Sequence, residues 1–344
     1  MMIPVVMNTS FQRLAEIDDY ISFIWTNRYY TAGDFELCVI ANAYNISLMQ
    51  KWNYIVRDDD ENVGIIEHLN VQHSEEGSVL IVLGRFLPSI LGRRIIASQT
   101  TVTGTISACI NKLINQNVIN PSIAARQISN FILGSYSFSE TMQAQFNGEN
   151  LLDTISLICE TYGLGFKVTL NSSNQFVFTL YQGLNRTYDQ NVNPYVIFSN
   201  EYDNLISSDY EENYQDIATA VLVAGEGEGT ERVTAWATNG ATGINRCEKY
   251  DDQPNLSSTL EEVSTAEYTA LLQEAGKEKL TTYTAAFTGE VSFENVRYKT
   301  DVNIGDLVVI ENTKWGINMN ARLVEVIESM SETGEYTITP TFGV

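Results

Sequence analysis

The sequence predicts a mainly β protein with α+β parts, and three observations carry this prediction. Apolar and polar residues alternate through many short segments, which is the period of a half-buried strand. Two segments instead repeat apolar residues at helical spacing. Aromatic residues make up 10% of the chain, with 18 tyrosines, and such residues are enriched in strands. The 344 residues also exceed the size at which one core usually stops growing, so we expect at least two domains.

Strands are expected throughout residues 1–98. Apolar side chains recur at every second position at 35–39 and again at 52–56. The run SVLIVLG at 78–84 predicts a nearly continuous apolar strand. A short helical turn should follow it, because Pro88 stands where the first turn of a helix tolerates proline.

Residues 99–200 combine helices and strands. Apolar residues recur on one helical face at 106–114 and at 151–162. The second helix should end at Gly163, because glycine commonly terminates helices. The segments GFKVTL and QFVFTLYQG then predict a hairpin turning at 171–174.

The last third of the chain returns to strands, at 216–238 and at 291–343, with one helix expected at 261–280. Ser264 and Glu267 have the spacing of a capping box, in which each side chain bonds the other residue's backbone. Neither an internal repeat nor a low-complexity linker interrupts the sequence.

The charge balance excludes two classes of partner. Twenty basic and 43 acidic residues give 20 − 43 = −23. A nucleic-acid clamp needs clustered lysine and arginine, and adhesion to an anionic membrane needs the same. We therefore expect neither binding mode.

Neither a membrane span nor a secretory signal is expected. The chain lacks an apolar run of about 20 residues, and its start lacks a basic region followed by a long apolar one. Cys38, Cys109, Cys159 and Cys247 stand far apart without a CxxC motif. They should be reduced, mostly buried thiols, which suits folding in a cytoplasm.

Few residues suggest chemistry. His68 and His73 are the only histidines, and a strand would place them on opposite faces, so we interpret them as surface residues. Neither a GxSxG motif nor a recognisable cysteine-nucleophile segment supports a nucleophilic site. With 43 acids, paired carboxylates arise by chance and indicate little.

Two acidic segments imitate binding loops without completing them. DDDENVG at 58–64 starts like a calcium loop, but Val63 and Leu69 stand where glycine and glutamate are needed, so a solvated hairpin is expected. GEGEGT at 225–230 lacks the lysine of a phosphate loop and is followed by a strand, so it should be a flexible hairpin tip. The sequence therefore predicts no metal, no cofactor and no catalytic residue.

Four segments in order resemble the tail-hub (tail-associated, baseplate-hub-like) proteins of siphophages and related prophages. They are GRFLPSILGRRII, GENLLDTISLICETYGLGFKV, YQGLNRTYDQNVNPYVIFSNEYDNLISSDY, and DVNIGDLVVIEN followed by ARLVEVIES and TFG. Their order and spacing extend over about residues 50–344. In the third segment Gly183, Arg186 and Thr187 match the family pattern, whereas Asn185 replaces its usual aspartate.

The resemblance implies a structural role and a domain plan. Such hubs form trimeric rings at the distal end of the tail tube, and two β-barrel-like domains per subunit give the ring pseudo-sixfold symmetry. The plan assigns the first β-barrel-like domain to 1–98 and an α/β domain to 99–200. The second barrel-like domain takes 201–225 and 285–344, and a helix-containing insertion takes 226–284.

The implied partners are those of a virion protein assembled in the host cytoplasm. They are a homotrimer, distal-tail or tail-tube proteins, and fibre or receptor-binding proteins, without membrane insertion of this chain. Arg93, Arg94 and Arg186 are candidate intersubunit contacts, although Arg93 and Arg94 equally suit a salt-bridged helix–strand junction. Because the sequence stops at TFGV after the last expected strand, a wall-degrading enzyme is expected in another chain.

The resemblance suggests a role for the negative net charge. Three copies carry 3 × −23 = −69 charges, and like charge would let genome DNA pass through a ring without specific binding. Simple solubility is the alternative explanation of the same charge.

Two other functions remain open. A cell-wall-degrading tail enzyme predicts two carboxylates facing each other across a groove, or a metal bound by His68 or His73. A carbohydrate- or receptor-binding tail module predicts exposed aromatic platforms, with Trp236 and Trp315 beside glycine turns as candidates.

Overall fold

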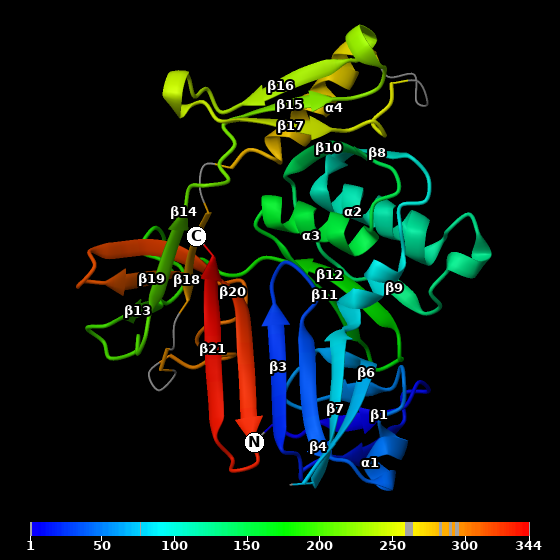
Figure 1. Cartoon of the computed structure of the whole chain (residues 1–344), viewed down its shortest axis with the longest axis vertical. Helices are drawn as coiled ribbons and strands as arrows, with labels where there is room; N and C mark the ends of the chain where they lie inside the picture. Colours follow the sequence, from blue (N-terminus) through cyan, green and yellow to red (C-terminus); the bar gives the residue numbers. More distant parts are fainter. Residues whose placement is uncertain are drawn as a thin grey trace.

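The chain is mainly β, as predicted, and its strands form several sheets. The computed structural model describes residues 2–75, 77–258, 264–281, 284–288, 291–292 and 296–343. Figure 1 shows a large sheet in the lower half, an α/β unit beside it, and a small β unit with one helix at the opposite end.

One large sheet contains strands from both ends of the chain. Its path is β14-β18-β21-β20-β3-β4-β7-β6-β5-β1-β2, and β19 joins it by pairing with β20 and β13. The N-terminal strands are β1 (Val5–Met7), β2 (Arg13–Glu16), β3 (Ser22–Arg28), β4 (Asp34–Ile40), β5 (Tyr54–Val56), β6 (Val63–Ser74) and β7 (Gly77–Phe86). The C-terminal strands are β13 (Ile197–Ser199), β14 (Asp209–Asn213), β18 (Thr284–Thr288), β19 (Leu307–Asn312), β20 (Ile317–Ser331) and β21 (Tyr336–Gly343).

Strands β1–β7 form the N-terminal lobe, which has its own core. Phe35, Leu37 and Val39 of β4 are buried, as their alternation predicts. They pack with Trp25 of β3, whose ring centre lies 4.4 Å from that of Phe86. Helix α1 (Ala43–Leu48) connects β4 to β5.

The expected strand at 52–56 is shorter than its pattern suggests. Only Tyr54–Val56 pairs, because Trp52 has a φ of +71°, a left-handed conformation that strands exclude. The apolar turn predicted after 78–84 is confirmed as a 3₁₀ helix, η1 (Leu87–Arg93), with Pro88 in its first turn.

The C-terminal lobe comprises β13, β14 and β18–β21, and β20 connects it to the N-terminal lobe. β20 pairs with β19 through Ile317–Arg322 and with β3 through Glu325–Ser331. The lobe's core includes Phe198, Phe287 and Phe342. Among the described residues, the strand pairing of neither lobe closes into a barrel.

The α/β unit confirms both predicted helices, α2 (Ile106–Ile114) and α3 (Leu151–Thr161). α2 continues into a π-helical turn, η2 (Asn115–Ile119), and η3 (Ala124–Arg126) follows. The predicted hairpin is also confirmed, and β9 pairs with its second strand. The unit's strands are β8 (Thr100–Thr105), β9 (Phe131–Leu133), β10 (Thr141–Phe146), β11 (Gly165–Leu170) and β12 (Phe176–Tyr181).

Strands β15–β17 and helix α4 form the upper unit at the top of Figure 1. Its elements are β15 (Ala220–Ala224), η4 (Gly229–Glu231), β16 (Thr234–Thr238), η5 (Gly243–Asn245), β17 (Glu248–Asp252) and α4 (Thr265–Lys277). The predicted capping box of α4 is present. Of the expected segments, 261–263 and 293–295 lie outside the described residues.

Two strands pair differently from the sequence-based plan. β15, assigned there to the second barrel-like domain, pairs with β16 and β17 of the upper unit. β13, assigned to the α/β domain, pairs with β19 of the C-terminal lobe. Both segments are short apolar strands, and their composition does not specify a partner.

Candidate functional site

A buried ionic cluster lies where the two lobes meet. Arg57, in the loop after β5, lies 2.6 Å from Asp59 and 3.1 Å from Glu328 of β20. Lys299 lies 2.7 Å from Asp60 and 2.9 Å from Glu328. The side chains of Arg57, Asp60 and Glu328 are 1%, 3% and 2% exposed, so these charges are almost completely removed from water.

Pairing within the cluster favours the charged forms of Arg57 and Asp59. Burial alone would lower the pKa of Arg57, but Asp59 and Glu328 outweigh it and raise that pKa. Burial likewise opposes ionisation of Asp59, yet Arg57 lowers the pKa of Asp59 below its ordinary value. The Tyr336 hydroxyl donates to Glu328 at 2.8 Å. The charges therefore fix the 57–60 loop against β20.

This cluster corrects the interpretation of the 58–64 segment. The expected hairpin forms, because β5 and β6 pair across it. It is not simply solvated, since Asp60 is buried against Lys299, 239 positions along the chain. The run of acids and the adjoining Arg57 were visible in the sequence, but Lys299 and Glu328 were too distant along the chain to be identified as partners.

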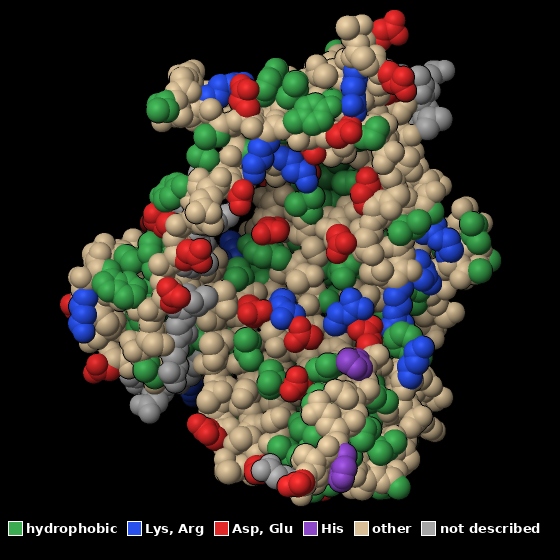
Figure 2. Space-filling view, in the orientation of Figure 1, with side chains coloured by type: hydrophobic (Ala, Val, Ile, Leu, Met, Phe, Trp, Pro, Cys, Tyr) green, Lys and Arg blue, Asp and Glu red, His purple; other side chains and the backbone are tan. Residues whose placement is uncertain are grey.

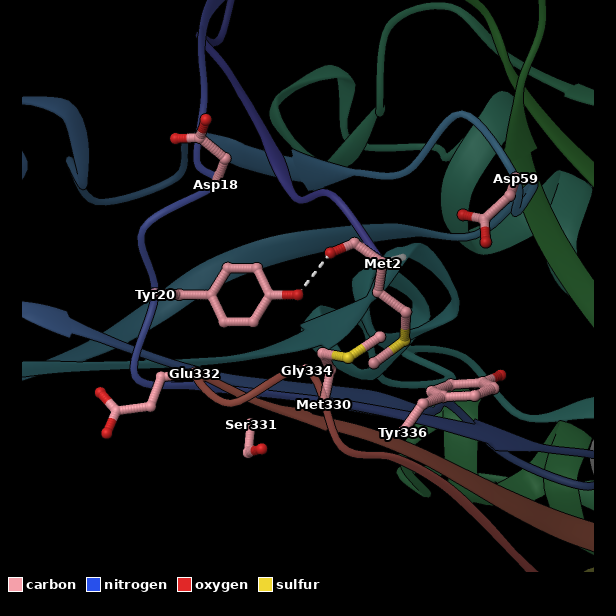
Figure 3. A pocket seen from close by; sticks show the side chains of 9 residues that line it. All are labelled: Met2, Asp18, Tyr20, Asp59, Met330, Ser331, Glu332, Gly334 and Tyr336. Atoms are coloured by element: carbon pink, nitrogen blue, oxygen red, sulfur yellow. Dashed lines mark hydrogen bonds between the residues drawn. The ribbon is translucent and has the colours of Figure 1, made fainter.

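A cavity of about 550 Å³ opens beside this cluster. Figure 3 shows the thioethers of Met2 and Met330 facing each other in its centre, with Tyr20 donating a hydrogen bond to the Met2 carbonyl at 2.7 Å. Met2, Tyr20 and Met330 are 2%, 4% and 6% exposed and form an apolar floor. The Tyr336 ring, 44% exposed, completes one wall.

The rim of the cavity is acidic. Asp18, Asp59 and Glu332 line it, and the described residues that line the cavity include neither lysine nor arginine. An apolar floor with anionic groups around it suits a ligand that carries both a flat apolar surface and a positive charge. The composition of the cavity thus specifies the class of group that it could accept.

The structure separates the two adjacent candidate arginines. Arg93 lies 3.5 Å from Glu67 and 4.1 Å from the centre of the Trp52 ring, so it forms part of a salt-bridged surface. Arg94 donates to the backbone carbonyl of Arg126 at 2.7 Å. Both residues have partners within the chain, and their role between subunits stays a prediction.

Arg186 is engaged inside the C-terminal lobe. It donates to Asp306 at 2.7 Å, and the two side chains are 8% and 2% exposed. Asn185, which replaces the family's usual aspartate, accepts from the Thr187 backbone at 2.9 Å and from its hydroxyl at 2.8 Å. The acidic partner of Arg186 therefore comes from a distant strand connection rather than from its neighbour.

Both candidate tryptophans are exposed. Trp236 on β16 is 41% exposed, and the Arg246 guanidinium lies 4.9 Å from its ring centre. Trp315 is 51% exposed in the turn between β19 and β20. They lie on different units, so they do not form a common platform.

The structure does not bring the other candidate residues that it describes together into one site. His68 and His73 are exposed on β6, and the described residues contain no cluster of three potential metal ligands. The 225–230 segment is a hairpin connection as predicted. The Glu226 carboxylate within it accepts hydrogen bonds from Ser257 at 2.9 Å and from Ser258. All four cysteines are free thiols, with Cys109 and Cys159 buried.

On the face shown in Figure 2, acidic and basic side chains are interspersed over the lobes and the upper unit. Within the described part of the chain, none of the helices is long and apolar enough to cross a membrane.

The fold is that of phage and prophage tail proteins. A tail protein from Neisseria meningitidis MC58 matches with a TM-score of 0.60 and 14% identity, covering 100% of this chain and 96% of that one. The 43 kDa tail protein of prophage MuSo2 from Shewanella oneidensis matches at 0.59 and 13%, covering 99% and 98%. Prophage tail protein gp18 from Listeria monocytogenes EGD-e matches at 0.55 and 12%, covering 99% and 94%.

The sequence itself identifies the family. Residues 3–344 match the siphovirus ReqiPepy6 Gp37-like proteins, and the chain belongs to this family of phage tail proteins. The tail-protein resemblance noted in the sequence is thereby confirmed. A search of curated protein sequences gave no match.

Proposed function

We propose that the chain is a structural hub protein at the distal end of a phage or prophage-derived tail. Three copies form a ring that closes or extends the tail tube. The ring contacts the distal-tail or tube proteins on one side and anchors fibre or receptor-binding proteins on the other. The protein is then a component of the virion and acts by assembly rather than by catalysis.

The observation that carries this proposal is the joining of two β lobes by β20. Each lobe has its own core, and the β3–β20 pairing makes them parts of one sheet. Three chains would present six such lobes around an axis, which suits docking on a hexameric tube. Barrel-like closure of the lobes, and the division into two hub domains, an α/β domain and an insertion, belong to this proposal.

The net charge is part of the same hypothesis. A trimer with 3 × −23 = −69 charges would not adhere to DNA that passes through its ring. We expect the purified protein to leave duplex DNA unretarded in a gel at low salt. Retardation of DNA by the wild-type protein would contradict a non-adhesive lumen.

The mass of the purified protein in solution tests the ring. A trimer has three times the 38.5 kDa chain mass, and particles of that mass should look like rings with six lobes by electron microscopy. A monomer at every concentration, also in the presence of the neighbouring tail proteins, would contradict the proposal. A cell-wall zymogram tests the enzymatic alternative, and a cleared zone would support it.

A receptor- or carbohydrate-binding module is the second candidate function. The exposure of Trp236 and Trp315 favours it, because sugars stack on exposed aromatic rings. Binding of host-wall glycans that is lost in both Trp236→Ala and Trp315→Ala would support this function. Binding that is absent from the wild type would leave the hub as the function supported.

A further inference from the structure

The turn between β19 and β20 presents an unusual pair of side chains to solvent. Asn312 of β19 pairs with Ile317 of β20, and Lys314 and Trp315 lie in the turn between them. Lys314 is exposed, and 51% of Trp315 is accessible. An exposed tryptophan offers a large apolar contact area, and tryptophan is enriched among the residues that dominate binding energies. We call these two residues the Lys-Trp tip.

The tip and the cavity beside the ionic cluster have complementary chemistry. The cavity's floor of Met2, Met330 and Tyr20 would receive the flat indole, since thioethers make favourable contacts with aromatic rings. Its rim carries the carboxylates of Asp18 and Glu332, together with Asp59, which is already paired with Arg57, and the tip supplies an ammonium group. The volume of about 550 Å³ falls within the usual range of ligand pockets.

The tip and the cavity lie at opposite ends of one strand. β20 begins directly after the tip, at Ile317, and ends at Ser331, which lines the cavity next to Met330. Fifteen residues of strand extend up to about 50 Å. Figure 1 shows the β19–β20 hairpin projecting to one side and the lower end of β20 beside the N-terminus. The two surfaces therefore cannot meet within a single chain.

We propose that the Lys-Trp tip of one copy inserts into the Met2/Met330 cavity of the next copy, an inference that rests on the proposed ring. The contact is head-to-tail, because each copy offers a tip to one neighbour and a cavity to the other. A head-to-tail contact generates a closed ring when the rotation between copies closes. Trp315 lies on the methionine floor, and Lys314 faces the carboxylates of Asp18 and Glu332.

Single substitutions on exposed residues should separate the copies without disturbing the fold. Trp315→Ala should weaken self-association about 30-fold or more, as for a central aromatic anchor. Lys314→Glu and Glu332→Lys should each weaken it, and the double charge swap should restore it. Trp236→Ala is the matched control, because it removes a tryptophan on β16 that is 41% exposed, against 51% for Trp315. Sedimentation velocity over a concentration series measures all five proteins.

A mixing experiment tests the direction of the contact. The Trp315→Ala variant has an intact cavity, and the Glu332→Lys variant has an intact tip. In an equimolar mixture only the pairing of these two surfaces is productive, so the mixture should form dimers and nothing larger. Neither variant alone should form them.

The outcomes separate this inference from the ring itself. A wild-type trimer that persists in Trp315→Ala, or a charge swap that does not restore association, would overturn the tip–cavity contact and leave the hub proposal standing. A wild-type protein that stays monomeric in every condition would overturn the ring. Association lost equally in Trp236→Ala would also refute the assignment.

Discussion

Replacing Glu328 by glutamine should destabilise the protein by about 3 kcal/mol. Glu328 forms ion pairs at 3.1 Å with Arg57 and at 2.9 Å with Lys299, and it accepts a hydrogen bond from Tyr336. Glutamine keeps the shape and an acceptor for the tyrosine but removes the charge. Breaking a buried ion pair by removing one partner costs about 3–5 kcal/mol, and Asp59 remains beside Arg57, so the lower end of that range applies.

Glu325→Gln is the matched control, because it makes the same change three positions earlier on β20. Glu325 pairs with Arg28 of β3 at 2.7 Å, so this pair also joins the two lobes. Its side chains are 25% and 30% exposed, against 2% and 1% for Glu328 and Arg57. Water and salt partly screen this half-buried pair, and Asp34 remains beside Arg28, so its loss should cost about 1 kcal/mol.

Urea unfolding followed by tryptophan fluorescence measures the difference. Trp25 is fully buried, and the Arg57 guanidinium lies 5.6 Å from its ring centre, so its emission reports on this junction. The midpoint should fall for Glu328→Gln far more than for Glu325→Gln, with an unchanged dependence on urea. Equal losses in the two variants would refute the claim that burial, rather than pairing across the lobes, determines the cost.

Three further predictions concern the upper unit and one close backbone contact. Burial raises the pKa of Glu278 to about 7 from an ordinary 4.5. The fold thus favours the protonated form of Glu278, so its stabilising contribution should be complete below pH 4.5 and lost as the pH rises through 7. Amide exchange in α4, corrected for intrinsic rates, should therefore be faster at pH 8 than at pH 5.5. The Glu278→Gln variant should show no such difference. Ser264→Ala should destabilise helix α4 by about 1 kcal/mol, because it removes the capping box. Amide exchange in the first turn of α4 should then be faster than in the wild type, and unchanged exchange there would contradict the prediction. Gly183→Ala should lower the free energy of unfolding by about 1–3 kcal/mol, because the new Cβ would lie 1.9 Å from the Gly305 carbonyl oxygen. Urea unfolding measures this loss. A variant as stable as the wild type would show that the backbone moves aside at little cost.

Local features of the fold were predictable because their causes are local. The helices at Ile106–Ile114 and Leu151–Thr161 follow from apolar spacing, and Gly163 ends the second with a φ of +64°. The capping box at Ser264 depends on residues three positions apart. Each of these signals lies within a few residues of the structure that it specifies.

The candidate site was not predictable, because its main contacts join distant segments of the chain. Arg57 and Glu328 are 271 positions apart, and Arg186 and Asp306 are 120 apart. Met2 and Met330 form one floor from opposite ends of the chain. A single sequence contains many acids that could pair with each arginine, and the register of β20 against β3 is what places Glu328 at the junction with the N-terminal lobe.

In the proposed ring, the same strand that joins the lobes would also set the geometry of assembly. β20 carries the tip before its first residue, Glu328 in the buried cluster, and Met330 at the cavity. Because tip and cavity are fixed to one paired strand, the angle between successive copies depends on how rigidly that strand is held. The ion pairs of Glu328 hold its cavity end against the 57–60 loop, which also supplies Asp59 to the rim. Loss of the Glu328 ion pairs would therefore alter ring closure while leaving the tip contact in place. Glu328→Gln should broaden the distribution of oligomers, whereas Trp315→Ala should shift it to monomers.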